Sequence, residues 1–401
     1  MTADLRSLFF ILLVAALAPL LVELPGRIRL PVVVAEIALG IVIGPQVLDL
    51  AQPKGVVKFL SNIGLTFLFF LAGREVDLDR IRGLPGKLAG AGWLLSALLA
   101  LVAALVVDAG GDLVSTLLLG VALCTTAIGT LMPILRDAGE LRTELGPYVL
   151  SAGIAGEFGP LLLMAVLLSS DHRPGAAFAL LIFFAVISLG AAYVALHLRP
   201  THVIATIQRT MGTSGQLGLR LSLVLLSGLV YLASRFGFDI VLGAFAAGLV
   251  VGLVTKGPGS EELRMRFDGI GFGFAIPLFF VVTGMRFDLD ALFGSAGTIL
   301  RLPLFLALFL VVRGTPAFLL YRRAIPPGDR LPLALYSATA LPLVVAVTTI
   351  GLQTGRISSA NAAALVGAAM TSVLVFPLVA LGLRRRDERG SQLATEGTTS
   401  S

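Results

Sequence analysis

The sequence FFLAGREVDLD at residues 69–79 returns as FFVVTGMRFDLD at residues 279–290. Ahead of the first copy, residues 40–44 read GIVIG, and ahead of the second copy, residues 248–252 read GLVVG. The two matches keep the same order and nearly the same spacing along the chain. Chance similarity between apolar segments is the alternative, and one such glycine pair alone is also a common helix-packing motif. Together the two matches predict an internal repeat.

Composition places this repeat in a membrane. Of the 401 residues, 57% are hydrophobic and 13% are charged, whereas soluble domains carry about 25% charged residues. Lipid must therefore be the solvent for much of the surface. We expect thirteen membrane spans, some of them tilted or interrupted, at residues 7–24, 31–50, 57–73, 88–108, 113–135, 146–169, 175–197, 217–234, 237–255, 267–285, 298–321, 331–353 and 360–383.

Each pair of matched segments is separated by seven spans, so the two copies face opposite sides of the membrane. Inverted repeats of this kind build secondary transporters. The sequence predicts an all-α polytopic membrane protein with one transmembrane domain over residues 1–384. The domain comprises repeat one at about residues 7–169, a linking span at 175–197 and repeat two at about 217–383, and the polar tail at residues 385–401 is predicted to be disordered.

The distribution of Lys and Arg predicts the orientation. Twenty-one of the 30 basic residues fall on the side opposite the N-terminus, and seven fall on the N-terminal side. Because cytoplasmic loops carry the excess of basic residues, we expect the N-terminus outside and the C-terminus in the cytoplasm of a bacterial inner membrane. These loops also explain the formal net charge of +6, so we expect no nucleic-acid partner.

Few residues suit metal or covalent chemistry. Cys124 is the only cysteine, and the three histidines lie scattered without ligand spacing, at positions 172, 197 and 202. This excludes a disulfide framework and a Cys/His zinc site. The connections between spans are short and contain no nucleophile–base pair. We therefore expect no enzyme activity, no resident metal and no cofactor.

Two charged residues lie near the middle of predicted spans, Glu157 in the sixth and Arg313 in the eleventh. An ionisable group at that depth costs about 2.5–3.5 kcal/mol on insertion scales, so each is a functional candidate. The alternative is a buried ion pair that fixes packing and adds little stability. Glu36 lies near the start of the second span, where we expect hydrogen bonding at the helix end, with a role in transport as the alternative.

Two predicted spans are interrupted by proline and clustered hydroxyl groups. The fifth span contains TTAIGTLMP at residues 125–133, and the twelfth contains SATALP at residues 337–342. These spans are also seven apart. Proline loosens a helix, and the freed carbonyls can coordinate a cation at the membrane midplane. The alternative is an ordinary kink facing lipid. The candidate residues are Thr125 and Thr126 as ligands, with Gly129, Pro133, Thr339 and Pro342 at the helix breaks.

Four segments together resemble the monovalent cation:proton antiporter-2 family, which includes sodium/proton and potassium/proton antiporters. They are PVVVAEIALGIVIGP at residues 31–45, residues 64–73 with the DLD that follows, LGAFAAG at 242–248 and PLFF at 277–280. The resemblance covers about residues 5–384. It implies a thirteen-span inverted-repeat fold in which a core domain with two crossing, unwound helices moves like an elevator against a dimerisation domain. It also implies a homodimer.

The resemblance further implies roles for individual residues. The fifth and twelfth spans match the crossing helices, Glu157 matches the ion-binding acid, and Arg313 matches a basic residue that faces this acid. Members of the family usually carry Asp-Asp, Asn-Asp or Gln-Asp in the sixth span, whereas this chain has Gly156-Glu157. The first of the two polar positions is therefore lost, which leaves open the ion selectivity and antiport itself.

The sequence supports exchange of Na⁺ or K⁺ for protons, without deciding between the two cations. Glu157 would bind either a proton or a cation, while Thr125, Thr126 and freed carbonyls complete an oxygen shell. One carboxylate predicts electroneutral exchange. A cation channel or uniporter remains an alternative, and so does an organic-anion transporter in which Arg313 contacts the substrate.

Overall fold

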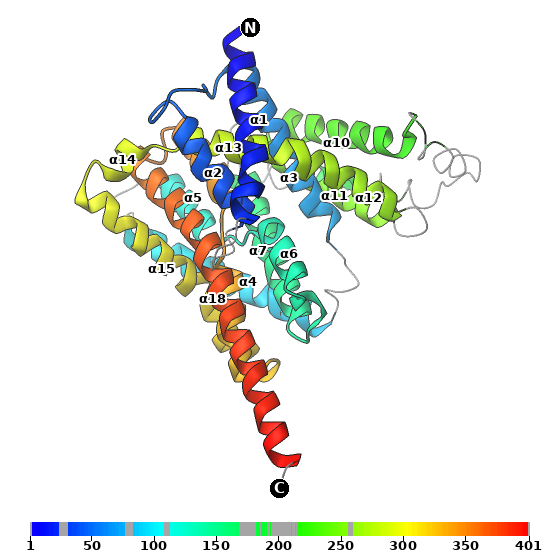
Figure 1. The fold of residues 1–401 in the computed structure, drawn as a ribbon, viewed down its shortest axis with the longest axis vertical. Coiled ribbons are helices and arrows are strands. Elements are labelled where there is room, and N and C mark those ends of the chain that lie inside the picture. The colour runs from blue at the N-terminus through cyan, green and yellow to red at the C-terminus, as the bar shows by residue number, and fades with distance from the viewer. Residues whose placement is uncertain are drawn as a thin grey trace. The chain divides into compact units, whose positions relative to one another are not determined.

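The structure is a computed structural model, and it describes residues 2–23, 31–76, 83–107, 113–167, 215–255 and 260–399, with a few positions between 182 and 213. Within these ranges the chain forms helices and connections and no strand (Figure 1). The helices are α1 Thr2–Glu23, α2 Val32–Ile43, α3 Gly55–Arg74, α4 Leu84–Val107, α5 Leu113–Leu123, α6 Ile128–Asp137, η1 Glu140–Arg142, α7 Gly146–Leu167, α10 Leu217–Arg235, α11 Ile240–Val254, α12 Ser260–Ile270, η2 Gly271–Ala275, α13 Ile276–Met285, α14 Leu289–Phe293, α15 Ala296–Leu319, η3 Tyr321–Arg323, α16 Pro327–Ala338, α17 Pro342–Gln353 and α18 Ser359–Thr399.

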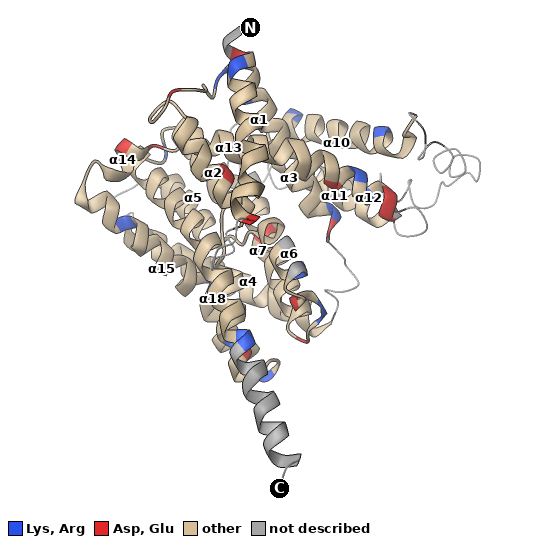
Figure 2. Ribbon diagram, in the orientation of Figure 1, with Lys and Arg blue, Asp and Glu red and all other residues tan. Residues whose placement is uncertain are grey.

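The predicted all-α polytopic class is confirmed. Among the described residues, ten helical segments are long and apolar enough to cross a membrane, and α2 and α11 are shorter apolar helices. Uncharged residues make up most of their length, as the tan ribbon in Figure 2 shows. These twelve segments overlap twelve of the predicted spans. The predicted linking span at 175–197 lies almost wholly outside the described residues, so the count of thirteen stays a prediction.

The chain divides into two compact units. Unit 1 comprises Met1–Leu78 and Leu161–Arg286, and unit 2 comprises Asp79–Pro160 and Phe287–Ser401. Each unit therefore draws on both halves of the sequence. Unit 1 contains α1 to α3 and α10 to α13, whereas unit 2 contains α4 to α6, most of α7, and α14 to α18.

In unit 1, α3 and α11 touch through their backbones. A Cβ atom built on Gly248 would lie 2.0 Å from the carbonyl oxygen of Phe70, and one built on Gly73 would lie 2.2 Å from that of Phe245. Any side chain at either position would overlap the facing helix. Glycine is therefore required at both positions, as in other close membrane helix pairs.

The pair α2 and α13, also in unit 1, makes an equivalent close backbone contact, and each of these two contacts is called a seam below. A Cβ atom on Gly40 would lie 2.2 Å from the carbonyl oxygen of Val281, and one on Gly284 would lie 2.0 Å from that of Ile37. Phe245 and Ile37 each precede the facing glycine of their own helix by three residues. Phe70 and Val281 likewise each precede theirs by three.

The two seams thus place matched glycines against matched carbonyls. Gly40 corresponds to Gly248 in the two GxxxG segments, and Gly73 corresponds to Gly284 at the ends of the two FF segments. The predicted repeat relates one seam to the other. These contacts support the inverted repeat, which stays a prediction for the chain as a whole.

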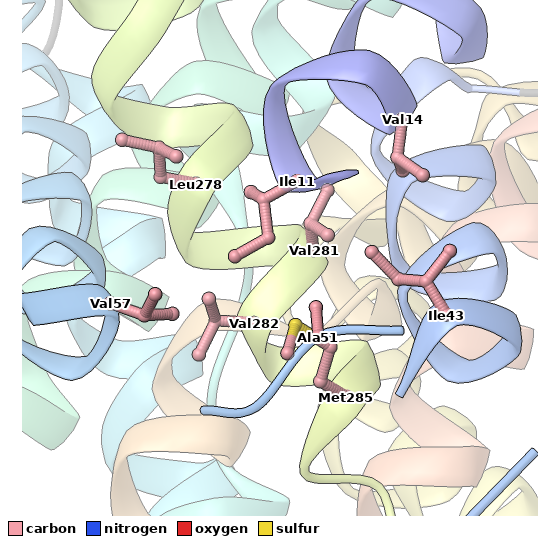
Figure 3. Packing of buried hydrophobic residues seen from close by; sticks show 9 residues of the cluster. All are labelled: Ile11, Val14, Ile43, Ala51, Val57, Leu278, Val281, Val282 and Met285. Carbon is pink, nitrogen blue, oxygen red and sulfur yellow. The ribbon is translucent and has the colours of Figure 1, made fainter. Parts of the chain in front are cut away.

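Apolar side chains fill the space beside the second seam. Helices α1, α2, α3 and α13 contribute to one buried cluster in unit 1, which Figure 3 shows with its members converging on α13. Its buried members are Ile11, Val14, Ile43, Ala51, Val57, Leu278, Val281, Val282 and Met285. The cluster fixes α2 against α13.

Both predicted helix interruptions are present, and both lie in unit 2. Helix α5 ends at Leu123 and α6 begins at Ile128, while α16 ends at Ala338 and α17 begins at Pro342. Pro342 is the first residue of α17, a position at which the missing N–H has no helical partner to lose. Thr339 lies within the second break.

The sequence misplaced one end of the first interruption. Gly129 and Pro133 were expected at the break, but both lie inside α6, and the break occupies residues 124–127. A proline inside a helix removes one hydrogen bond, here to the carbonyl of Gly129, and α6 tolerates this loss. The helix is instead interrupted at residues 126 and 127, because their backbone N–H groups donate to carbonyls on other elements of unit 2.

The end of unit 2 also carries a charged cluster. Arg384 in α18 donates to Glu140 in η1, with Nε 3.3 Å from Oε2, and its Nη1 donates to Asp329 in the first turn of α16. The three side chains are 13%, 8% and 13% exposed, respectively. Helix α18 has its last residue at Thr399, and the disordered tail that the sequence predicts from residue 385 stays a prediction.

Candidate ion-binding site

The two helix breaks of unit 2 are joined to each other. The backbone N–H of Ala127 donates to the carbonyl of Thr339 at 2.8 Å, and the Thr126 hydroxyl donates to the carbonyl of Ser337. Backbone groups at membrane depth must be satisfied within the protein, because lipid supplies no partners. The breaks therefore supply partners for each other, and the two discontinuous helices meet at this point.

Helix α7 joins the same point next to Glu157. The N–H of Thr126 donates to the carbonyl of Gly156 at 2.8 Å. In a regular helix that carbonyl would accept from residue 160, which here is Pro160 and has no N–H. The freed acceptor therefore takes the donor from the first break. Glu157 is the next residue and is only 2% exposed.

Arg313 connects the elements around the breaks. It lies on α15 and is 4% exposed. Its Nε lies 2.9 Å from Oγ1 of Thr126 and 3.3 Å from the carbonyl of Ser337. Its Nη1 donates to Oγ of Ser96 on α4 at 3.2 Å, and its Nη2 donates to the carbonyl of Ala152 on α7 at 3.0 Å. A permanent cation is thus held against both breaks and α7.

The two candidate threonine ligands have different surroundings. The Thr125 hydroxyl donates to the carbonyl of Ala122 at 3.0 Å, which leaves the lone pairs of its oxygen as acceptors for a cation. The Thr126 oxygen instead accepts the hydrogen bond from Arg313. In this conformation the Thr125 oxygen keeps acceptor capacity, whereas the Thr126 oxygen holds the guanidinium.

Thr339 resembles Thr125 in its surroundings. Its hydroxyl donates to the carbonyl of Leu335 at 3.0 Å, one turn back along α16. Thr339 also supplies the carbonyl that Ala127 binds, so its backbone is committed to the crossing. Hard monovalent cations take oxygen ligands, and unit 2 gathers hydroxyl, carbonyl and carboxylate oxygens near the breaks.

A small cavity opens beside Arg313 within unit 2. Its lining includes Trp93, Tyr321, Ser337 and Arg313, and it has room for about one water molecule. Nε1 of Trp93 is buried and has no hydrogen-bond partner among the residues that the structure describes. A bound water would satisfy this donor. Sequence reasoning missed Trp93 and Ser96, because a lone tryptophan or serine in an apolar span gives no signal.

Glu36 belongs to unit 1, whereas the residues described above belong to unit 2. It is the fifth residue of α2 and 4% exposed, so it lies near the start of its helix as the sequence predicts, and its hydrogen bonding at the helix end stays a prediction. It precedes Gly40 by one turn, beside the seam with α13. Among the described residues, no cluster of three or more His, Cys, Asp or Glu side chains is arranged to hold a metal ion.

Known proteins resemble this chain over most of its length. The putative Na⁺/H⁺ antiporter YjbQ of Bacillus subtilis is 28% identical over 98% of this chain, and the chain spans 65% of that protein. A probable Na⁺/H⁺ antiporter of Methanocaldococcus jannaschii is 24% identical over 92% of this chain and 94% of its own length. The fold matches that of the sodium proton antiporter MjNhaP1 from Methanocaldococcus jannaschii, with a TM-score of 0.62, 17% identity, and coverage of 94% of this chain and 96% of that one.

A family model describes nearly the whole of the helical region. The model of the transmembrane sodium/hydrogen exchangers matches residues 12–381. That range contains both helix breaks, Glu157 and Arg313. The resemblance to monovalent cation:proton antiporters that the sequence predicts is therefore confirmed, and the chain belongs to the sodium/hydrogen exchanger family of membrane proteins.

Proposed function

We propose that this protein is a secondary transporter that exchanges Na⁺ or K⁺ for protons. The observation that carries the proposal is the position of Glu157, a carboxylate 2% exposed on α7, one residue from the carbonyl that binds the first helix break. The names of the relatives support the same activity. A transporter performs no covalent chemistry, so no enzyme activity is proposed.

The coupling arises from competition at one carboxylate. Glu157 binds either a proton or a cation, and each form is then presented to the opposite side of the membrane by alternating access of the elevator type. The Thr125 hydroxyl and the carbonyls of the broken helices complete the oxygen shell. One proton exchanged for one monovalent cation moves no net charge, so the cycle is electroneutral.

Arg313 balances the charge of the empty site. After cation and proton have both left, Glu157 carries a negative charge in a setting where an isolated buried charge is strongly unfavourable. In the part of the chain that the structure describes, the groups that accept hydrogen bonds from the guanidinium are uncharged, at Thr126, Ser337, Ser96 and Ala152, so its charge remains available to a neighbouring carboxylate. We also propose, from the sequence alone, a homodimer in the bacterial inner membrane with the N-terminus outside.

Exchange in proteoliposomes tests the proposal. A cation gradient imposed on vesicles that contain the purified full chain should drive proton movement, reported by an internal pH-sensitive dye. Glu157→Gln should abolish this exchange, because the amide keeps the shape but cannot ionise, and Glu157→Asp should keep part of it. Glu261→Gln, an exposed position in the first turn of α12, is the control and should exchange at the wild-type rate.

The same vesicles distinguish the alternatives. A channel or uniporter would pass cations without proton movement, and Glu157→Gln would leave that flux in place. An organic-anion transporter would show no cation-driven proton movement at all. If Glu157→Gln exchanges cations for protons at the wild-type rate, the assignment of the carboxylate is wrong.

A further inference from the structure

Gly156 has no space for a side chain, and the groups that fill this space are Arg313 and Thr126. A Cβ atom on Gly156 would lie 2.3 Å from Nη2 of Arg313 and 2.4 Å from Oγ1 of Thr126. It would also lie 2.8 Å from Cβ of Thr126. Even the smallest side chain at position 156 would therefore overlap both residues.

Neither neighbour can move away without losing its own contacts. The tip of an arginine is flexible in general, but this guanidinium is held by Thr126, Ser96 and the carbonyl of Ala152. Thr126 is β-branched, its N–H is bound to the carbonyl of Gly156, and its hydroxyl is bound across the crossing. A methyl group on Gly156 would displace the arginine first, because its tip is the more mobile of the two.

The same face of α7 carries two further glycines with different neighbours. A Cβ atom on Gly153 would lie 2.5 Å from the tip of Ile128, and one on Gly159 would lie 2.2 Å from the ring of Trp93. The face is thus covered by an aliphatic group, a guanidinium and an indole in succession. At Gly156, the residue that precedes Glu157, the group that covers this face is the permanently charged guanidinium of Arg313.

We propose that Gly156 is a positioning residue. Because it has no side chain, the Arg313 guanidinium can lie next to the residue that precedes Glu157, and from there its charge sets the pH at which cations compete with protons for the carboxylate. The inference rests on the proposed function. A positive charge at this place favours the ionised carboxylate, so cations compete with protons at lower pH than they would without it. Among the described side chains, Cys124 and Tyr321 are titratable groups that interact electrostatically with Arg313.

The pH profile of exchange measures this role, whereas a loss of packing alone would lower the rate without moving the profile. Arg313→Ala should move the profile to higher pH by about 1 unit or more, because a nearby opposite charge has an effect of that size. Gly156→Ala should move it in the same direction. The double variant should show no further shift, since both changes remove the same interaction.

Two glycine variants serve as matched controls. Gly153→Ala adds a methyl group to the same helix one turn earlier, where it would lie 2.5 Å from Cδ1, 3.0 Å from Cγ1 and 3.1 Å from Cβ of Ile128, an uncharged side chain. Gly90→Ala adds one to α4, where nothing lies within 4 Å. Both should keep the wild-type pH profile. A wild-type profile in Gly156→Ala would overturn the inference, and so would a double variant whose shift is the sum of the two single shifts.

Thr126→Ala covers the case in which Gly156→Ala does not fold. It removes the hydroxyl that accepts from Arg313 and adds no atom, so it should shift the profile in the same direction by a smaller amount. An unshifted profile in that variant would overturn the inference. The proposed function is tested separately. Exchange by Glu157→Gln would refute the exchange mechanism. If Glu157→Gln is inactive but the pH profiles of the Gly156 and Thr126 variants are unshifted, only the positioning role of Gly156 is refuted.

Discussion

Replacing Gly248 by alanine tests the close seam between α3 and α11 in unit 1. The new Cβ atom would lie 2.0 Å from the carbonyl oxygen of Phe70, whereas ordinary van der Waals contact begins at 3.4 Å. The obstacle is backbone and cannot rotate away. The two helices must therefore separate by about 1.4 Å at the contact, which also disturbs the neighbouring step at Gly73.

Two opposing effects decide the magnitude. Overpacking a close contact costs about 1–3 kcal/mol, while alanine gains about 1 kcal/mol over glycine in helix propensity. The control Gly228→Ala lies in α10 of the same unit, where nothing lies within 4 Å of the added atom, so it shows the propensity gain alone. The difference between the two variants isolates the contact, at about 1–3 kcal/mol.

Thermal unfolding in detergent, followed by loss of the monodisperse peak in size-exclusion chromatography, measures this difference. The midpoint of Gly248→Ala should lie at least about 2 °C below that of Gly228→Ala. Gly40→Ala should behave like Gly248→Ala, because the predicted repeat relates the two positions and the second seam has a 2.2 Å contact with Val281. Equal midpoints for Gly248→Ala and Gly228→Ala would refute the seam.

Three further outcomes follow from the geometry. Cation–proton exchange should be nearly insensitive to an imposed membrane potential, provided that the ion used to set the potential is not the substrate, and a current that reverses with the cation gradient and disappears in Glu157→Gln would contradict the one-for-one stoichiometry. Arg384→Met should lower stability by about 3 kcal/mol, because two nearly buried carboxylates lose their cation, whereas Arg385→Met, at an exposed neighbouring position, should change it little in the same unfolding assay. Burial raises the pKa of Tyr321 from 10.0 to about 12; this residue lies in η3, beyond the end of the Ala296–Leu319 span in the structure. The unfolded chain therefore loses this proton first, and stability should fall as pH rises from 10 toward 12. Tyr321→Phe should remove that part of the fall, and an identical alkaline loss of stability in both proteins would show that the phenol contributes nothing.

The candidate residues of unit 2 could be predicted from the sequence because charged and helix-breaking residues are unusual in apolar membrane spans. Glu157 and Arg313 are charges in apolar spans, and the hydroxyl-rich interruptions conflict with a continuous helix. The structure buries both charges and breaks both helices close to the predicted positions. The roles of these residues in transport remain proposals that the exchange assays test.

The partners of Arg313 could not be predicted. Ser96 lies 217 residues away in sequence, and a single serine in an apolar helix is indistinguishable from a small packing residue. The importance of Gly156 was also hidden, because its sequence shows only the absence of a side chain and not what occupies the space. Local reasoning erred at Pro133 for a related reason: backbone donors at residues 126 and 127 find acceptors on other elements, and this places the break ahead of the proline.

Two other prolines explain why the crossing can exist in a membrane. A break in a helix exposes donors and acceptors that lipid cannot satisfy. Pro160 frees the carbonyl of Gly156 inside a helix that otherwise remains intact, and the N–H of Thr126 binds this carbonyl at 2.8 Å. Pro342 begins α17 without adding an unsatisfied donor to the second break. Pro160 thus makes an acceptor available to the first break, and Pro342 removes a donor from the second. The carbonyl that Pro160 frees binds the first break one residue from Glu157.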